Sequence, residues 1–340
     1  MHYLVTGHTG FKGAWLTHWL LHRGHRVSGI ALDPEPGSLF ARCDLGSLMS
    51  ADLRLDIRQQ GPLQAAVAEL APDVVVHLAA QPLVRESYRD PRTTFETNVM
   101  GTLNVVQAVS RTPSVTAQVI VTTDKVYRNV RQIWGYRETD PLGGDDPYSA
   151  SKAMADILTA SWVQSFPGPP TAIARAGNVI GGGDVGQDRL LPDLLRQFAD
   201  GQPAIIRYPD AVRPWQHVLD CLNGYLMLAE ALLAGQGTGA WNFGPDAASF
   251  VPVRVIADKA CDLWGDGAHW QHVNQGAPHE AELLALDARK AQVDLHWRNV
   301  LDLDASLAWT VSWEQARLAG SDPGALTRGQ IVEFEDLAAS

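Results

Sequence analysis

A glycine loop near the start of the chain constrains the fold more than any other feature. Gly7, Gly10 and Gly13 follow at three-residue intervals after a strand-like stretch, residues 2–6, and open a segment that predicts a helix from Phe11 to His22. Glycine permits a tight turn and lets backbone N–H groups approach a pyrophosphate at the N-terminus of a helix. In this position the spacing predicts a dinucleotide site at the first strand–helix turn of a parallel sheet.

The rest of the first half alternates short apolar, β-branched runs with segments of helical patterning. The predicted strands after the first are residues 26–32, 73–78, 118–122 and 171–175, and the predicted helices after the first are 62–70, 94–109 and 149–165. Repetition of βαβ units predicts an α/β fold with a doubly wound parallel (Rossmann) sheet.

The pattern changes after about residue 178, where strands become brief and glycine, proline and tryptophan become more frequent. We expect residues 1–177 to form an NAD-binding Rossmann domain, with segments near 215–243 returning to it. Residues from about 178 to 214 and from 244 to 340 are expected to form a smaller C-terminal α+β lobe that binds substrate.

Composition narrows the classes of partner. Of 340 residues, 46% are hydrophobic and 19% are charged, an ordinary globular mixture with a net charge of -11. The negative charge argues against nucleic acid and anionic membranes as partners. The three cysteines are too few and too dispersed for a disulfide framework or a zinc site. We therefore expect no metal, no membrane span, no signal segment and a cytoplasmic location.

Acidic residues bear on which dinucleotide binds, one of them after the predicted strand at 26–32 and one after a short strand-like stretch at 53–55. Asp33 lies where a carboxylate can accept hydrogen bonds from a ribose diol and repel a 2′-phosphate, so it favours NAD over NADP. The alternative is a solvent-facing turn aspartate before Pro34. Asp56 and Ile57 are candidates for contact with adenine, and the alternative for Asp56 is a helix N-cap.

Tyr148 and Lys152 are four residues apart and share one face of a predicted helix. A nearby ammonium stabilises tyrosinate, so we expect the pKa of Tyr148 to be lowered toward neutrality. Tyr148 can then take a hydroxyl proton while hydride leaves to nicotinamide. The hydroxyl of Thr123, at the end of the preceding strand, can bind the same oxygen. An exposed helix pair is the alternative, but hydroxyl, Tyr and Lys together resemble the catalytic set of short-chain dehydrogenases.

Asp124 and Lys125 directly follow this hydroxyl. A simple alcohol dehydrogenase needs no charged pair there, whereas removal of water from a sugar needs an acid for the leaving hydroxyl and a base for the carbon proton. We therefore predict that Asp124 is the acid. Lys125 is a base only if burial or nearby cations lower its pKa, and otherwise it is a structural or phosphate-facing charge while water is the base.

Longer motifs resemble one family in particular, and they follow in order over nearly the whole chain. They are residues 7–16, 79–85, 123–125, 143–149, 175–184, 213–218, 241–245 and 278–281. By these motifs the chain resembles the CDP-glucose 4,6-dehydratases, extended short-chain enzymes of the NAD-dependent epimerase/dehydratase family. Thr123 departs from the serine usual in that family. The hydroxyl survives, so the departure affects the sugar pocket more than the reaction.

This resemblance implies a cycle in which tightly bound NAD⁺ takes hydride from C4 of CDP-D-glucose, with Tyr148 as base. Water then leaves across C5–C6, and hydride returns to C6, which regenerates NAD⁺ and gives the 4-keto-6-deoxy sugar. Asn178 and Arg213 would hold the diphosphate, for which arginine offers a bidentate grip. Lys12 would add a positive charge near the pyrophosphate or else be a solvated residue at the helix start.

The resemblance also suggests further candidate residues that bind the cofactor and further candidates that bind the substrate. Those at the cofactor are Thr9, Phe11, Leu78, Ala79, Ala80, Gln81, Asn98, Thr122 and Ala176. Those at the wall around the substrate are Arg85, Arg189, Arg207, His279 and Glu280. Surface ion pairing is the alternative for Arg189, Arg207, His279 and Glu280.

Three other functions remain open, and so does the assembly of the protein. A nucleotide-sugar epimerase would not need Asp124, and a 4,6-dehydratase of TDP- or GDP-hexoses would share every motif argued from chemistry. A non-catalytic NAD-binding regulator would not need to retain Tyr148 and Lys152. The family is oligomeric, so a homodimer or larger homo-oligomer is expected. The predicted helices at 94–109 and 149–165 carry apolar residues suited either to that interface or to the chain's own core.

Overall fold

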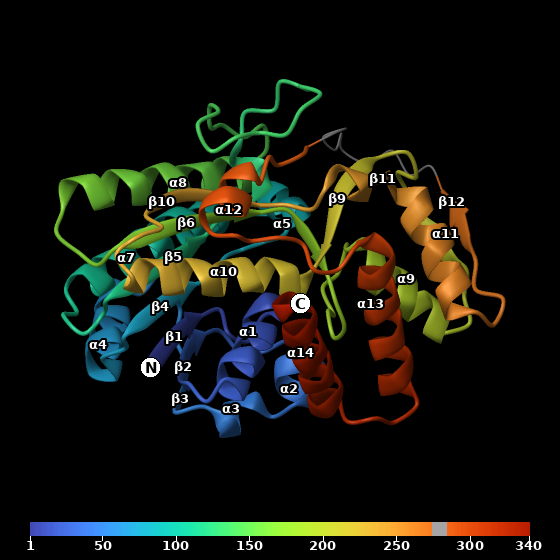
Figure 1. Ribbon diagram of the computed structural model, residues 1–340, viewed down its shortest axis with the longest axis horizontal. Coiled ribbons are helices and arrows are strands. Elements are labelled where there is room, and N and C mark those ends of the chain that lie inside the picture. The colour runs from blue at the N-terminus through green and yellow to red at the C-terminus, as the bar shows by residue number, and fades with distance from the viewer. Residues whose placement is uncertain (274–283) are drawn as a thin grey trace.

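The computed structural model describes residues 1–273 and 284–340, and a parallel sheet is its central element (Figure 1). Seven strands lie in the order β10-β6-β5-β4-β1-β2-β3, and every neighbouring pair is parallel. The chain reverses its direction across the sheet between β1 and β4, which is where doubly wound folds bind ligands. The strands are β1 (His2–Thr6), β2 (Arg26–Ala31), β3 (Ala51–Arg54), β4 (Val74–His77), β5 (Ala117–Val121), β6 (Thr171–Ala176) and β10 (Gly239–Phe243). The predicted doubly wound fold is confirmed.

Helices cover both faces of this sheet. One face carries α1 (Phe11–His22) and α10 (Val218–Leu233), and the other carries α4 (Gln60–Leu70) and α7 (Thr102–Ser110). All five residues of strand β1 are buried, because helices cover both faces of the sheet at this strand. Tyr3 and Val5 pack with α1, whereas Leu4 faces α4 and α7.

A second, smaller core lies beside the sheet, on the right in Figure 1. Its helices pack through Leu194, Ile256 and Leu307, all buried. The elements of this region are β7 (Asn178–Ile180), α9 (Leu190–Ala199), β8 (Ala204–Ile206), β9 (Val212–His217), β11 (Phe250–Pro252), α11 (Val253–Trp264), β12 (Trp270–His272) and α13 (Leu303–Leu318). Strands β11, β9 and β7 form one small sheet, and β12 and β8 form another.

Besides α10, further late segments return to the large sheet or to the helices on it. Strand β10 pairs with β6, and its Trp241 lies opposite Ala174. The C-terminal helix α14 (Pro323–Ala339) packs on α1 (Figure 1), where the rings of Phe334 and Trp19 meet at 5.5 Å. The chain is therefore interleaved, and sequence neighbours after residue 177 alternate between the two cores.

The remaining α-helices are α2 (Leu39–Arg42), α3 (Leu45–Leu48), α5 (Val84–Arg89), α6 (Pro91–Phe95), α8 (Pro147–Ser165) and α12 (Arg289–Asp294). Helices α2 and α3 pack on α1, α8 packs beside α7, α5 and α6 pack on α8, and α12 contacts β10. The predicted helix over 94–109 is not continuous, because a π-helical turn over Glu96–Gly101 separates α6 from α7. This wide turn carries Asn98, whose buried amide has hydrogen-bond partners on two other elements.

The structure bears on two features that were considered from composition, the cysteines and membrane spans. Cys43, Cys221 and Cys261 are all free thiols. None of the helices formed by residues 1–273 and 284–340 is long and apolar enough to cross a bilayer.

Candidate active site

The three glycines of the opening loop differ in what a side chain at each position would contact. Gly7 has a φ of +76°, and a Cβ there would lie 2.7 Å from the backbone N of Ala79. A Cβ at Gly13 would lie 2.2 Å from the carbonyl oxygen of Gly7. A Cβ at Gly10 would meet only that same oxygen, at 3.4 Å. Gly7 and Gly13 are therefore required by packing, whereas Gly10 leaves space that the protein itself does not use.

The N-terminus of α1 fits a pyrophosphate. Gly10 is its N-cap, no side chain caps it, and its first turn carries no acidic residue. The first N–H groups of the helix are thus available to an anion, and the helix dipole favours negative charge there. The residues present therefore fit the phosphates of a dinucleotide.

Replacing Gly10 with alanine should separate cofactor binding from folding. The new Cβ makes one ordinary contact, so the free energy of unfolding should fall by no more than about 1 kcal/mol. The Kd for NAD should rise roughly tenfold or more, because the methyl group displaces charged hydrogen bonds to the phosphates. Calorimetry and chemical denaturation check both values. Gly13→Ala is the matched control and should destabilise the protein even without NAD; equal cofactor affinity in Gly10→Ala and the parent would contradict this role.

The predicted cofactor residues lie in three kinds of place: the glycine loop with α1, the carboxyl ends of strands of the large sheet, and helices packed beside those ends. They therefore share one edge of the sheet, the edge at which its parallel strands end. Asp33 follows β2 with 90% of its side chain exposed, 3.4 Å from Nε of Arg54. Asp56 follows β3 and accepts hydrogen bonds from the backbone and guanidinium of Arg58. This carboxylate forms a local turn with Arg58, and the N-cap of α4 is Gln59, so the helix N-cap alternative for Asp56 is wrong. Contact of Asp56 and Ile57 with adenine stays a prediction.

Asn98 joins the cofactor edge to the catalytic helix. Its Oδ1 accepts from the backbone N–H of Gln81 at 2.8 Å, and its Nδ2 donates to the carbonyl of Gln81 and to Oγ of Ser151. Gln81 ends the segment that follows β4, together with Leu78, Ala79 and Ala80. Because Ser151 lies on α8, the position of this segment and that of α8 are coupled.

Helix α8 presents Tyr148 and Lys152 to this edge. The helix begins at Pro147, and the Asp146 carboxylate accepts from the backbone N–H of Ser149, as an N-cap does. Lys152 is buried, and its Nζ donates to the carbonyl of Val121 at 2.8 Å. Burial, together with the positive charge of Lys12, lowers the pKa of Lys152 to about 8.

The pKa of Tyr148 differs from the sequence prediction. Burial raises it to about 12, although a hydrogen bond with the Thr123 hydroxyl opposes the shift. The expected lowering by the ammonium of Lys152 is therefore wrong for the protein without cofactor. Formation of tyrosinate requires a further positive charge, which an oxidised nicotinamide carries when it is bound.

Asp124 lies next to the Thr123 hydroxyl, on a short 3-10 helix, Asp124–Val126, that follows β5. Thr123 Oγ1 donates to Asp124 Oδ1 at 2.9 Å, and the carboxyl group is buried. Burial raises the pKa of Asp124, while Lys125, Arg213 and Lys12 act in the opposite direction. A Cβ on Gly177 would lie 2.9 Å from Asp124 Oδ2, so the absence of a side chain at Gly177 makes room for this carboxyl.

Lys125 is half-buried, and its backbone N–H lies 3.4 Å from Thr123 Oγ1. Its charge acts on Asp124, which places it in the same electrostatic cluster. The choice between a base and a structural charge stays open.

Predicted diphosphate ligands lie on two adjacent strands of the small sheet. Asn178 begins β7 and lies opposite Trp215 of β9, the strand that also carries Arg213. Arg213 acts electrostatically on Asp124, and Ala176, at the end of β6, precedes Gly177 in the same corner. The structure thus brings Asn178, Arg213 and Asp124 together.

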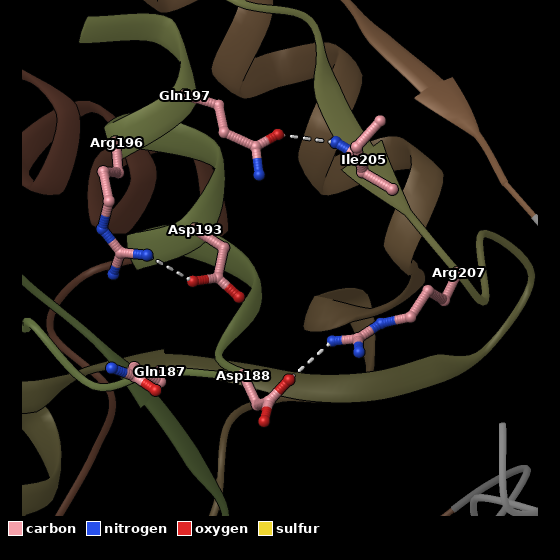
Figure 2. Close-up of a pocket in the computed structure, with 7 residues that line it drawn as sticks. All are labelled: Gln187, Asp188, Asp193, Arg196, Gln197, Ile205 and Arg207. Carbon is pink, nitrogen blue, oxygen red and sulfur yellow. Dashed lines mark hydrogen bonds and ion pairs between the residues drawn. The ribbon is translucent and has the colours of Figure 1, made fainter. Parts of the chain in front are cut away.

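Three predicted wall arginines form ion pairs. Nη1 of Arg189 lies 2.8 Å from Asp184, while Arg85 and Arg207 both reach Asp188 Oδ1 at 3.0 Å. Figure 2 shows Arg207 and Asp188 among the residues that line a pocket of about 340 Å³ beside α9 and β8. It is lined by Gln187, Asp188, Asp193, Arg196, Gln197, Ile205 and Arg207. The catalytic side chains are not part of this lining, and His279 and Glu280 lie outside the described residues.

Sequence analysis missed a buried ion pair behind the catalytic helix. Asp156 lies one turn after Lys152, and Arg175 of β6 binds both its oxygens at 2.7 and 2.8 Å. Asp156 also accepts from Thr122 Oγ1, and Arg175 donates to Tyr127 OH. This network fixes α8 against the ends of β5 and β6. Its one sequence signal was the spacing of Asp156, four residues after Lys152.

A doubly wound sheet with this loop and this Thr–Tyr–Lys edge defines a dinucleotide-binding enzyme of the short-chain dehydrogenase type. The chain belongs to the NAD dependent epimerase/dehydratase family, which it matches over residues 3–244. The predicted cofactor, NAD, is confirmed at the level of that family.

Individual members of this family are similar to the chain over nearly its whole length. The chain is 43% identical to the CDP-glucose 4,6-dehydratase of Salmonella typhimurium, over 97% of this chain and 95% of that protein. Among solved structures it is similar to DesIV, the dTDP-glucose 4,6-dehydratase of Streptomyces venezuelae with NAD and TYD bound. That similarity has a TM-score of 0.82 and 25% identity, over 95% of this chain and all of that one (100%). The resemblance predicted from the motifs is confirmed.

Proposed function

We propose that this chain converts CDP-D-glucose to CDP-4-dehydro-6-deoxy-D-glucose and water. The observation that carries this proposal is the buried carboxyl of Asp124 beside the Thr123 hydroxyl and the Tyr148–Lys152 pair. Hydride transfer alone needs only the hydroxyl, tyrosine and lysine, whereas expulsion of a hydroxyl also needs an acid. The similarity to the Salmonella protein named CDP-glucose 4,6-dehydratase, over nearly the full length, supports the same reaction.

Oxidation at C4 is assigned to the Thr123–Tyr148 pair. Bound NAD supplies the hydride acceptor for this step and the hydride donor for the last one. Tyr148 takes the proton of the C4 hydroxyl, and the Thr123 hydroxyl binds the same oxygen and holds it in place. Lys152, fixed by the carbonyl of Val121, places an ammonium next to this exchange.

Loss of water is assigned to Asp124. Once C4 is a ketone, the proton on C5 is acidic, and the C6 hydroxyl leaves as water when an acid protonates it. Burial raises the pKa of Asp124, so its carboxyl holds a proton at a higher pH than an exposed aspartate does. Lys125 is the candidate base for C5, and water is the alternative.

The substrate's diphosphate is assigned to Asn178 and Arg213, which lie on adjacent strands beside the acid. A guanidinium binds phosphate oxygens in pairs and offsets the net charge of -11 locally. Arg85, Arg189 and Arg207 are assigned to the wall around the nucleoside, and Arg207 lines a pocket that could hold this end of the substrate. The cytosine preference rests on the Salmonella relative alone.

Incubation of the purified protein and NAD with CDP-, TDP-, UDP- and GDP-hexoses tests this proposal by mass spectrometry. We expect CDP-glucose to lose one water, and the other nucleotides to react much more slowly. Water loss from another nucleotide alone would keep the reaction and overturn the base assignment. A change in the stereochemistry of the sugar without loss of water would identify an epimerase.

The domain organisation and the assembly are proposals as well. We propose the division made from the sequence, with residues 1–177 and the returning segments near 215–243 as the NAD domain and most of the rest as the substrate lobe. Helix α14, which that division puts in the substrate lobe, packs on α1 and belongs with the NAD domain. For a homodimer we propose the exposed apolar side chains of Met100, Met154 and Ile157, on the π-helical turn and α8. Three free thiols fit a reducing cytoplasm as the proposed location.

A further inference from the structure

Tyr127 is a buried residue that the proposed chemistry does not use, although it directly follows the short helix that carries the acid. It is the C-cap residue of the 3-10 helix Asp124–Val126, and its backbone N lies 3.5 Å from the carbonyl oxygen of Asp124. Its side chain is 1% exposed and stacks on the ring of Tyr136 at 5.3 Å. A 3-10 helix this short has few and poorly aligned hydrogen bonds of its own, so its position depends on what anchors its two ends.

The hydroxyl of Tyr127 has two hydrogen-bond partners, and both lie on strands of the large sheet. It donates to Oδ1 of Asn242 at 2.7 Å and accepts from Nη1 of Arg175 at 2.8 Å. Burial raises the pKa of Tyr127, so the hydroxyl keeps the proton that it donates. Arg175 and Asn242 lie opposite each other in the β6–β10 pair. The hydroxyl therefore anchors one end of the acid-bearing helix to two neighbouring strands.

Arg175 connects this anchor to the helix that carries Tyr148 and Lys152. Its other two nitrogens, Nε and Nη2, donate to the carboxylate of Asp156 on α8 at 2.8 and 2.7 Å. Arg175 and Asp156 are both buried. One guanidinium thus binds Asp156, on the helix of the oxidation step, and Tyr127, beside the acid of the elimination step. Because the guanidinium is planar and its donors point in fixed directions, it fixes how its two partners lie relative to each other.

Neither the charge of Arg175 nor the packing of the core requires the hydroxyl of Tyr127. Asp156 already balances the guanidinium, and the carbonyl oxygen of Glu138 accepts from the same Nη1 at 3.1 Å. The ring of Tyr127 belongs to an apolar cluster with Val126 and with Ala153 of α8, and a phenylalanine ring would fill the same space. What the hydroxyl adds is the position of the acid-bearing helix relative to α8.

We propose that Tyr127 is a positioning residue for the loss of water. Its bond to Arg175 sets the distance between the acid, Asp124, and the helix of the oxidation step. This inference rests on the proposed dehydratase function and concerns its second step alone. Oxidation at C4 and protonation of the C6 hydroxyl take place on one bound sugar, so groups on two different elements must reach two of its oxygens. Displacement of Asp124 leaves hydride transfer intact and misplaces the proton donor.

A single turnover of CDP-glucose by the parent and by Tyr127→Phe, each with NAD bound, measures the two steps separately. Absorbance of reduced nicotinamide reports oxidation, and mass spectrometry reports loss of water. In Tyr127→Phe, loss of water should slow by about tenfold to 10²-fold, because a misplaced reacting group costs a factor of that size. Oxidation should keep its rate, so reduced nicotinamide should accumulate. Unchanged loss of water would overturn the proposal.

Tyr136→Phe is the matched control. It removes another buried hydroxyl from the same apolar cluster, but that hydroxyl accepts from the backbone N–H of Val130 and donates to Oδ1 of Asn129. Neither partner belongs to the helix that carries Asp124, so both steps should keep the parent's rates. Equal slowing of both steps in Tyr136→Phe and Tyr127→Phe would show that the hydroxyls only support the fold, which would also contradict the positioning role.

Arg175→Lys breaks the same bond from the other side. Lysine can keep an ion pair with Asp156, but it has no fork of donors that also reaches Tyr127. It should accumulate reduced nicotinamide as Tyr127→Phe does. The double variant should be no slower than the slower single variant, because both changes remove one shared interaction. Slowing factors that multiply in the double variant would mean that the two residues act independently, and the proposed coupling would be wrong.

A measurement without sugar keeps this inference separate from the proposed function. The carboxyl carbon of Asp124, labelled with carbon-13 and assigned by its absence from Asp124→Asn, reports its surroundings by nuclear magnetic resonance. Burial raises the pKa of this group, so displacement toward solvent should lower the measured pKa in Tyr127→Phe but not in Tyr136→Phe. An unchanged Asp124 signal in Tyr127→Phe would overturn the proposal even if CDP-glucose is dehydrated. A shifted signal would support it even if CDP-glucose is not the substrate.

Discussion

Replacing Tyr148 with phenylalanine lowers kcat for water loss by roughly 10³-fold, because proton transfer by a positioned side chain contributes about 10²–10⁴-fold. The change removes one hydroxyl from a half-buried residue whose ring stays in place, so the fold and α8 should persist. Affinity for NAD should fall far less than kcat. Steady-state rates and calorimetry on the same preparation measure the two effects. An active Tyr148→Phe variant would assign the C4 proton to another group.

The pH dependence of this residue gives a second readout of the same prediction. In the protein without cofactor, burial raises the pKa of Tyr148 to about 12, because burial disfavours the charged phenolate. A bound positive nicotinamide favours the phenolate, so NAD⁺ should lower this pKa. Ultraviolet difference titration of parent and Tyr148→Phe, each with and without NAD⁺, measures the shift. A titration of Tyr148 that NAD⁺ leaves unchanged would mean that the tyrosine is not activated by the cofactor.

Asp124→Asn should produce the second large effect, and only on one part of the cycle. Asparagine keeps nearly the same shape and can still accept from Thr123 Oγ1, but its amide is not acidic enough to transfer a proton to the leaving hydroxyl. Water loss should slow by about 10²–10⁴-fold, whereas oxidation at C4 persists. Mixing the variant with substrate in a single turnover should therefore accumulate reduced nicotinamide, visible by absorbance, with little dehydrated sugar.

Gly177→Ala is a matched comparison for Asp124, because its Cβ would lie 2.9 Å from Oδ2 and would displace the carboxyl without removing it. It should slow water loss less than Asp124→Asn does. Full dehydration by Asp124→Asn would place the acid on another residue. Conversion of the sugar without water loss, at the same rate in the parent and in Asp124→Asn, would instead identify an epimerase.

Local signals explain why much of the fold was predictable. Residues 2–6 and Phe11–His22 are the bounds of β1 and α1, because a strand buried on both faces and a glycine turn are each encoded within a few residues. The Asp146-Pro147 start of α8 likewise fixes where Tyr148 lies. Strand ends in a parallel sheet share one edge, so the order of the chain was enough to group the cofactor candidates.

Contacts between segments distant in the sequence could not be predicted from such local signals. The π-helical turn at Asn98 depends on hydrogen bonds to Gln81 and Ser151, which no helical pattern reveals. The side chain of Lys12 turns inward to Tyr225, which lies 213 residues later in the chain, so the alternative of a solvated lysine at the helix start is wrong. The raised pKa of Tyr148 depends on burial, whereas spacing alone suggested only the effect of Lys152. In each case the local geometry or the pKa depends on residues that tertiary packing brings close, although they are distant in the sequence.

The fate of the hydrogen on C4 tests the central claim most directly. CDP-glucose labelled with deuterium at C4 should yield a dehydrated product that carries the deuterium at C6, because hydride leaves C4 and returns to C6 within one bound cofactor cycle. Mass spectrometry with nuclear magnetic resonance locates the label. Deuterium that remains at C4 in a hexose of altered stereochemistry that has lost no water, or deuterium that is lost to solvent, would contradict the account.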